Sequence, residues 1–382
     1  MPRITAEKIE FLPEDRYAIE EQSPGITPAT YTSLFNGAIR DGDTTKYFKF
    51  LEEIQEKDAD ILHSTETRTS YITSKEWTVE GENEGEAKRI EDMLREIQGD
   101  PSNGLLTTDQ LIATFGGVSY LTGISMSEIV TDGRKILGFS HIPSHFLTFK
   151  DSVHYPRLWT QEEQGGVPFN QDKMISHYLH TGMDPARGWL GNGISWQYVL
   201  KRAAMSARLD YQRKYGKGFF LVNMPGSKDS YEQSWATAEE LIENYSEVDG
   251  AVFEGEVEVD FKEAIQADGE YFFRSEENFK RDIARIILGQ ESTSSSVDSN
   301  RSTASVHMEV LEQRSIEDME AIEDTMTSQL VEKIKVLLGI SPEAVYEFKF
   351  VLSDMEETLD DEMEGESATE SDNADYVKSE GS

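Results

Sequence analysis

The chain has no cysteine among its 382 residues, so disulfide bridges and thiolate metal sites are both excluded. It also lacks any apolar run near the roughly 20 residues that cross a bilayer. The first residues, MPRITAEKIEFLPEDRY, do not contain the apolar core of a signal peptide. We therefore expect a soluble protein that is not exported by that route, and an intracellular or virion setting fits the absence of cysteine.

Basic residues are scarce, because 36 Lys and Arg face 73 Asp and Glu, for a formal net charge of −37. Proteins gain affinity for nucleic acid from Lys and Arg that neutralise phosphates and release counterions. The composition therefore argues against a conventional nucleic-acid-binding surface, and we expect any contact with DNA to be transient or repulsive.

One predicted helix, at 194–218, is a basic exception in which Asp210 is the single acid. We favour the interpretation that it presents a solvated face whose cations make salt bridges with an acidic neighbour, and a nucleic-acid or capsid contact is the alternative. The basic residues of this helix are Lys201, Arg202, Arg208, Arg213, Lys214 and Lys217.

Catalytic motifs are missing. The chain has neither the Gly-x-x-x-x-Gly-Lys-Ser/Thr phosphate loop nor the Gly-x-Ser-x-Gly nucleophile elbow. His177 and His180, with Asp172 and Asp184 nearby, have a spacing that is a weak metal signal, and structural histidines are favoured. We assign no catalytic residue, metal or cofactor, and predict that the protein is not an enzyme.

The most informative stretch is a serine-rich segment between two helices. The helix predicted at 269–289 places Phe279, Ile283 and Ile287 on one face, and a longer acidic helix follows from 306. Between them, ESTSSSVDSNRSTAS has a single large apolar side chain and neither glycine nor proline. We expect this segment to stay mobile and hydrated, and a long loop held between helices is usually functional or disordered. The apolar face of the longer helix comprises Met308, Leu311, Met319, Ile322, Met326, Leu330, Ile334 and Leu337.

Upstream, we predict an extended arm at 1–30, then helices and strands up to the basic helix. Thr44 is a candidate cap for the helix that runs on to Ser74, and Thr107 or Thr108 for a helix that contains Gly116 and Gly117. These glycines indicate close packing or a break. The turn Thr131-Asp132-Gly133 between alternating segments predicts a hairpin.

Three further features complete the organisation. Two strands and a helix form a predicted β-α-β insertion at 219–268, which belongs at the tip of two long helices. The segment after Gly339 predicts a short helix or strand. From Asp354 the chain carries about a dozen acids and one lysine, which predicts a disordered acidic tail. Trp196, Trp235 and Tyr245 are interpreted as core residues.

This order of parts resembles the portal proteins of tailed bacteriophages, and the Mu-type branch in particular. The features on which this resemblance depends are the basic helix that ends in YGKG, the insertion, the helix that ends in DIARIILGQ, the Ser/Thr loop and the long helix. The similarity covers Tyr31 to Gly339. The chain is short after Gly339, so we expect no large crown.

The resemblance implies an α+β portal fold divided into regions of known type. It implies an arm at 1–30, a wing at 31–193, stem helices at 194–218 and 269–289, a clip at 219–268, a tunnel loop at 290–305, a channel helix with reduced crown at 306–353 and a tail at 354–382.

The resemblance also implies a function and partners. Portals form rings, usually of twelve subunits, at one capsid vertex, where double-stranded DNA is packaged by terminase and later ejected. The implied partners are copies of the same chain, the terminase large subunit, major capsid and scaffolding proteins, head-completion or adaptor proteins and DNA, with no membrane. The implied location is the virion, after assembly in the cytoplasm of a bacterial host.

Two sets of residues would line the passage. Carboxylates on the channel helix would repel DNA phosphates and leave a conduit to which DNA does not stick, and the loop would touch DNA through Arg301 or hydroxyls. The predicted acidic wall is Glu309, Glu312, Glu317, Asp318, Glu320 and Asp324. The predicted tunnel loop contains Ser292, Thr293, Ser294, Ser295, Ser296, Asp298, Ser299, Asn300, Arg301, Ser302 and Thr303.

The main alternative is a non-enzymatic coiled-coil scaffold or adaptor protein of a phage head. The apolar spacing at 308–337 drifts toward four residues, whereas heptads keep an average of 3.5. An enzyme ranks third, because no site is visible.

Overall fold

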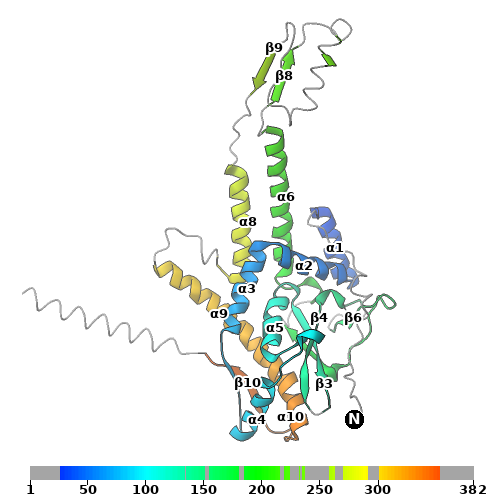
Figure 1. Ribbon diagram of the computed structural model, residues 1–382, viewed down its shortest axis with the longest axis vertical. Coiled ribbons are helices and arrows are strands. Elements are labelled where there is room, and N and C mark those ends of the chain that lie inside the picture. The colour runs from blue at the N-terminus through cyan, green and yellow to red at the C-terminus, as the bar shows by residue number, and fades with distance from the viewer. Residues whose placement is uncertain are drawn as a thin grey trace, which may run out of the picture.

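The computed structural model describes residues 26–133, 135–150, 155–179, 185–215, 219–223, 232, 235–236, 258–262, 270–290 and 301–352. Figure 1 shows a body of helices and small sheets from which two long helices project, α6 (Gly191–Tyr215) and α8 (Glu270–Leu288). Strands β8 (Phe219–Asn223) and β9 (Glu258–Lys262) pair antiparallel at the far end of this projection. The mixture of helices and antiparallel sheets confirms the predicted α+β class.

The N-terminal helices begin earlier and divide more often than predicted. Helix α1 (Pro28–Asp41) starts inside the expected arm, because the Thr27 hydroxyl accepts a hydrogen bond from the Thr30 amide and Pro28 suits the first turn. The single helix expected up to Ser74 is split into α2 (Thr45–Lys57) and α3 (Ala59–Thr73). Asp58 is extended there, and its carboxylate caps α3.

Thr44 precedes α2 but its side chain does not cap the helix. Its hydroxyl donates to the Leu147 carbonyl instead. By contrast, Thr107 caps α5 (Thr108–Thr122) through a full capping box with Gln110. Helix α5 passes Gly116 and Gly117 without a break, and a Cβ at Gly116 would make only an ordinary contact with Thr69 of α3, at 3.6 Å.

A four-stranded antiparallel sheet forms the centre of the body. Its order is β2 (Leu105–Leu106), β4 (Ile136–Ile142), β3 (Ile124–Thr131) and β7 (Met174–Tyr178). Strands β3 and β4 form the hairpin predicted around Asp132. Between β4 and β7 in the sequence order, a short strand β6 (Arg157–Leu158) pairs with β5 (Leu147–Thr148).

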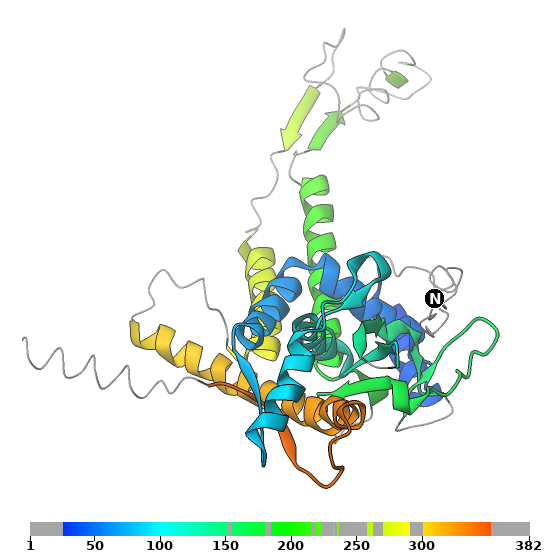
Figure 2. The same ribbon diagram turned by 60° about the horizontal axis from the view of Figure 1, so that its bottom comes forward.

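A second, two-stranded sheet joins distant parts of the chain. Strand β10 (Tyr346–Phe350) pairs antiparallel with β1 (Trp77–Gly81), so the segment after Gly339 contains a strand. Helix α4 (Glu84–Arg95) follows β1. In Figure 2, β10 and the end of the long C-terminal helix come forward at the base of the body, away from the projecting pair.

The long helix changes its winding near its C-terminal end. It consists of α9 (Arg301–Thr325), a π-helical turn at Met326–Val331 and α10 (Glu332–Leu338). Most of its predicted apolar face is buried in the chain's own core, but Met308 is 50% exposed and Leu337 is half-buried. The buried members are Leu311, Met319, Ile322, Met326, Leu330 and Ile334.

The tryptophan prediction is only partly correct. Trp196 packs against Tyr31 at a tilted angle, with ring centroids 5.8 Å apart, yet it is 41% exposed. Trp235 is half-buried, and Tyr245 lies outside the described residues. Within the described part of the chain, no helix has the length and apolar character needed to cross a bilayer.

His177 is a structural residue of the sheet. Its ring is fully buried, stacks on Phe115 at 4.9 Å and shares a 2.9 Å hydrogen bond between its Nδ1 and the Thr325 hydroxyl. Burial lowers the pKa of His177 to about 3. His180 and Asp184 lie outside the described residues, and in the described ranges no three His, Asp or Glu side chains form a metal-binding group.

This burial predicts a pH-dependent stability. Between pH 6.5 and about 3 the unfolded chain binds a proton at His177 that the folded chain does not. The free energy of unfolding should therefore fall as the pH falls through this window. Between pH 7 and 5 the stability advantage of the wild type over His177→Gln should shrink by about 2 kcal/mol, measured by urea denaturation. The exposed His63→Gln is the control, and equal changes for both variants would contradict the prediction.

Candidate functional site

The projecting helix pair is tightly joined along its inner face. Ile283 and Ile287 of α8 and Ile194 of α6 are fully buried in one core cluster. A Cβ at Gly193 of α6 would lie in ordinary van der Waals contact with the Ile286 side chain of α8, at 3.5 Å. The helix pair therefore has a packed inner face close to the body.

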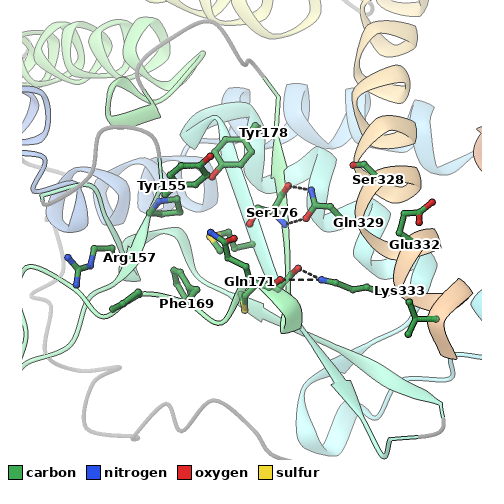
Figure 3. A pocket seen from close by; sticks show the side chains of 15 residues that line it. Tyr155, Arg157, Phe169, Gln171, Ser176, Tyr178, Ser328, Gln329, Glu332 and Lys333 are labelled. Atoms are coloured by element: carbon green, nitrogen blue, oxygen red, sulfur yellow. Dashed lines mark hydrogen bonds between the residues drawn. The ribbon is translucent and has the colours of Figure 1, made fainter. Parts of the chain in front are cut away.

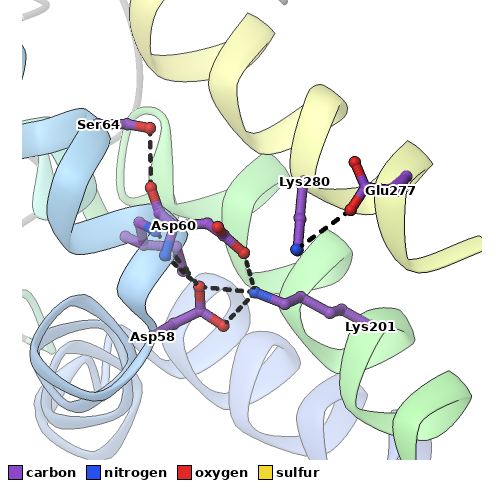
Figure 4. A network of polar contacts seen from close by, with 7 residues as sticks. Asp58, Asp60, Ser64, Lys201, Glu277 and Lys280 are labelled. Atoms are coloured by element: carbon purple, nitrogen blue, oxygen red, sulfur yellow. Dashed lines mark hydrogen bonds and ion pairs between the residues drawn. The ribbon is translucent and has the colours of Figure 1, made fainter. Parts of the chain in front are cut away.

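Cations of the basic helix are neutralised within the chain. The Lys201 ammonium, only 9% exposed, lies 2.8 Å from Asp58 and 2.5 Å from Asp60. Figure 4 shows this network where α6 meets the start of α3. Farther along the pair, Arg208 lies 2.6 Å from Glu276 of α8.

These contacts agree with the salt-bridge interpretation of the basic helix for Lys201 and Arg208, although Lys201 is buried rather than on a solvated face. Arg202 is half-buried. The side chains of Arg213 and Lys214, and Lys217 altogether, lie outside the described residues.

A second ionic junction holds the end of α8 against α9. The Arg68 guanidinium of α3 makes a bidentate contact with Asp318, at 2.7 and 2.8 Å, and donates at 2.6 Å to the Ile287 carbonyl. Arg314 donates to the Ile286 carbonyl at 3.0 Å. Cations at the last carbonyls of a helix also interact favourably with the partial negative charge at the C-terminal end of its dipole. Both arginines therefore stabilise the end of α8.

The junction between Arg68 and Asp318 is shielded from solvent. The side chains of Arg68 and Asp318 are each 2% exposed, and Arg68 also lies 4.7 Å from the centre of the Tyr120 ring. Burial raises the pKa of Asp318, and the Arg68 charge and hydrogen bonds oppose that rise. Gly289 is in the left-handed region with φ of 82°, and a Cβ there would lie 2.6 Å from Arg314. A glycine is therefore required where the chain leaves α8.

The predicted acidic wall needs two corrections. Asp318 does not face solvent, because it is the partner of Arg68 in this junction. Glu312 is half-buried and accepts a 2.6 Å hydrogen bond from the Tyr71 hydroxyl. The remaining members are exposed on α9, and they are Glu309, Glu317, Glu320 and Asp324.

The predicted tunnel loop is shorter than expected at its C-terminal end. Arg301, Ser302 and Thr303 already belong to α9, and Gln290 is buried. Positions 291–300 lie outside the described residues, as does the tail from position 353. The helix expected within the insertion is described only at positions 232, 235 and 236, which are helical.

The π-helical turn was not predicted. It connects the four-stranded sheet to the sheet formed by β1 and β10. The Gln329 amide exchanges two hydrogen bonds with Ser176 on the free edge of β7, at 2.9 and 2.8 Å. On the other side, the Thr327 hydroxyl accepts from the Phe348 amide of β10 at 2.9 Å. Wider turns of this kind often occur at functional positions. Here the turn aims two nearly adjacent residues at two different strands.

A cavity of about 850 Å³ lies beside this turn and is lined by Tyr155, Phe169, Gln329 and Lys333 among others. Figure 3 shows Gln329 and Lys333 reaching from the helix to β7. The Lys333 ammonium donates to the Met174 carbonyl at 2.8 Å, and burial lowers its pKa. Gln329 and Lys333 therefore satisfy backbone groups on the free edge of β7, and they form no catalytic arrangement with each other.

Comparison with solved structures gives the same fold at low sequence identity. A chain from the neck of an empty gene transfer agent particle, computed with C6 symmetry, matches with a TM-score of 0.53 and 13% identity, over 84% of this chain and 85% of that chain. A chain from the virion of a native gene transfer agent particle matches with a TM-score of 0.52 and 11% identity, over 89% of both chains. A chain from the native neck, computed with C12 symmetry, gives 0.51 and 11%, over 87% of this chain and 86% of that chain.

Among curated proteins, none matches the sequence significantly. The family described as the portal protein of Mu bacteriophage matches residues 48–371, which include the body from α2 onward, both projecting helices and the long helix. The match thus spans most of the chain and agrees with the resemblance carried by DIARIILGQ and the segment after it. The protein belongs to the Mu bacteriophage portal protein family.

Proposed function

We propose that the protein assembles into a ring at one capsid vertex and forms the channel through which double-stranded DNA is packaged by terminase and later ejected. The observation that carries this proposal is the α6–α8 pair, which projects from an α+β body and bears paired strands at its tip. The C6 and C12 symmetry of the similar neck structures supports a closed homo-oligomer, and the C12 case supports twelve subunits.

Each region has a proposed role in that ring. The strands at the tip form the clip that docks the terminase large subunit during packaging and head-completion or adaptor proteins afterwards. The body forms the wing, which meets major capsid and scaffolding proteins. The role is structural, without a cofactor, at the portal vertex of the virion, after assembly in the host cytoplasm.

The coiled-coil alternative is disfavoured by the packing of α9. A scaffold that assembles through this helix needs its apolar face free for a partner helix. That face is instead buried against the chain's own sheets and helices, including Leu311, Ile322 and Leu330. The apolar surface that a coiled coil would use is already occupied.

Negative-stain electron microscopy of the purified chain, with native mass spectrometry for the subunit count, tests the proposal. We expect rings with a central hole. Rods or small open oligomers over a range of protein concentrations would contradict it.

We also propose that the exposed carboxylates of α9 line the upper channel. The triple variant Glu317→Lys, Glu320→Lys, Asp324→Lys should slow DNA packaging in a defined packaging reaction, because lysines bind phosphates that carboxylates repel. The defect should shrink as salt rises, because salt screens the new attraction. The matched control Glu317→Gln, Glu320→Gln, Asp324→Asn removes charge without adding cations. Packaging by the lysine variant at the wild-type rate would count against an acidic wall.

A further inference from the structure

The long helix lies between the outer edges of two sheets. Strand β7 is the last strand of the four-stranded sheet, and β10 is the outer strand beside β1. On the β7 side, the Gln329 amide exchanges hydrogen bonds of 2.9 and 2.8 Å with the Ser176 backbone. One turn further along the helix, the Lys333 ammonium donates to the Met174 carbonyl at 2.8 Å. Figure 3 shows these two side chains side by side on the edge of β7.

The β10 side repeats the arrangement. The Phe350 amide donates to the Glu323 carboxylate at 2.7 Å, and the Phe348 amide donates to the Thr327 hydroxyl at 2.9 Å. On both sides the helix residues are four positions apart and their strand partners are two apart. Four helix residues rise about 6 Å and two strand residues about 6.8 Å, so the helix keeps pace with each strand.

A regular α-helix would not place these two rows of bonds on opposite sides. Glu323 and Lys333 are ten positions apart, and at about 100° per residue they would lie about 80° short of three full turns. A π-helical turn takes up one residue more than an α-helical turn. The rotation is then that of about nine residues, or about two and a half turns. The row on β10 and the row on β7 therefore lie on opposite sides of the helix.

The apolar spacing of the helix needs the same correction. Ile322, Met326, Leu330 and Ile334 are buried and follow one another at intervals of four. From 322 to 334 an α-helix would turn about 120° beyond three full turns, which would carry Ile334 out of the core. With one residue taken up by the π-helical turn, the excess falls to about 20°.

We infer that the π-helical turn holds one residue more than a regular helix so that a single helix closes the outer edges of both sheets. Uncovered strand edges present unpaired amides and carbonyls to other chains, and here the helix supplies side chains to those groups instead. The extra residue keeps the buried face continuous while it aims polar side chains at β7 and β10. This inference does not depend on the proposed function.

Two one-residue deletions test the inference. Deletion of Ser328, which is exposed in the turn, should convert the π-helical turn into an α-helical turn and leave the faces before and after it in phase. Deletion of Glu320, exposed on the same helix, should rotate the buried Ile322 relative to Asp318 by about 100°. In urea denaturation of the full chain, the Ser328 deletion should keep a cooperative transition at a modestly lower midpoint. The Glu320 deletion should have a far lower midpoint or no transition.

The substitution Ser328→Ala is the matched control, because it changes the side chain and keeps the number of residues. It should unfold at the wild-type midpoint. Loss of the cooperative transition on deletion of Ser328 would overturn the inference, and so would equal midpoints for the two deletions.

Amide hydrogen exchange, resolved to single residues by mass spectrometry with electron-transfer fragmentation, separates the two edges. Gln329→Ala should speed exchange of the Ser176 amide roughly tenfold, because one hydrogen bond is lost, and leave the Phe348 amide unchanged. Thr327→Val should have the reverse effect. If either variant speeds both amides equally, or neither, the residues of the turn do not close the two edges separately and the inference fails.

Discussion

Replacing Asp318 with alanine is expected to lower the free energy of unfolding by about 3–5 kcal/mol, because it leaves the Arg68 guanidinium buried without its counterion. Both side chains are 2% exposed, so water cannot take the place of the carboxylate. The carboxylate accepts two hydrogen bonds from Arg68, at 2.7 and 2.8 Å. Urea denaturation followed by circular dichroism at fixed protein concentration measures the loss.

The adjacent residue supplies the matched control. Glu317 is exposed on the same helix, so Glu317→Ala should change stability by no more than about 0.5 kcal/mol. A double variant, Arg68→Met with Asp318→Leu, should lose less than Asp318→Ala alone, because it leaves no buried charge. Equal losses for Asp318→Ala and Glu317→Ala would refute the assignment of Asp318 to the junction.

The second large effect is expected at the base of the stem. Lys201→Met should cost about 3 kcal/mol or more, because the Asp58 carboxylate is buried and would lose its cation. Asp58 also caps α3 through the Asp60 and Ile61 amides, so the same group supports a helix start and a contact between helices. The loss should appear in urea denaturation, together with faster amide hydrogen exchange in the first turn of α3.

Arg202→Met is the control for this experiment, because Arg202 is the next residue of α6 and is half-buried. It should cost less than half as much as Lys201→Met. If Asp58→Asn in the Lys201→Met background restores none of the stability, the unpaired carboxylate is not the cause of the loss. Substantial recovery would locate the effect in that charge.

The sequence predicted local features well, because short-range chemistry determines them. The capping box at Thr107 needs only Gln110 three residues later, and the hairpin needs only the turn at Asp132 between alternating segments. The insertion at the tip followed from its place between two long helices. Each of these signals lies within the segment that it organises.

Residues whose roles depend on distant partners were not predictable in this way. Asp318 has the same helical spacing as its exposed acidic neighbours, and its burial is determined by Arg68, which is 250 positions away. Lys201 belonged to a basic pattern, and its partners are the capping residue of α3 and a residue in the first turn of that helix, 143 and 141 positions away. The π-helical turn could not be predicted for a similar reason. Gln329 and Thr327 bond to strands β7 and β10, and the periodicity of the helix contains no information about these strands.

The bonds of Thr327 and Gln329 to two separate sheets have a mechanical consequence for the long helix. Its C-terminal part is anchored on both flanks, and Asp318 and the buried Leu311 fix its middle, so the part before Leu311 resembles a beam held at one end. A push on its free end, such as a passing load would deliver, should bend that end rather than slide the whole rod. The torque would then reach the two sheets together, as a single rigid base.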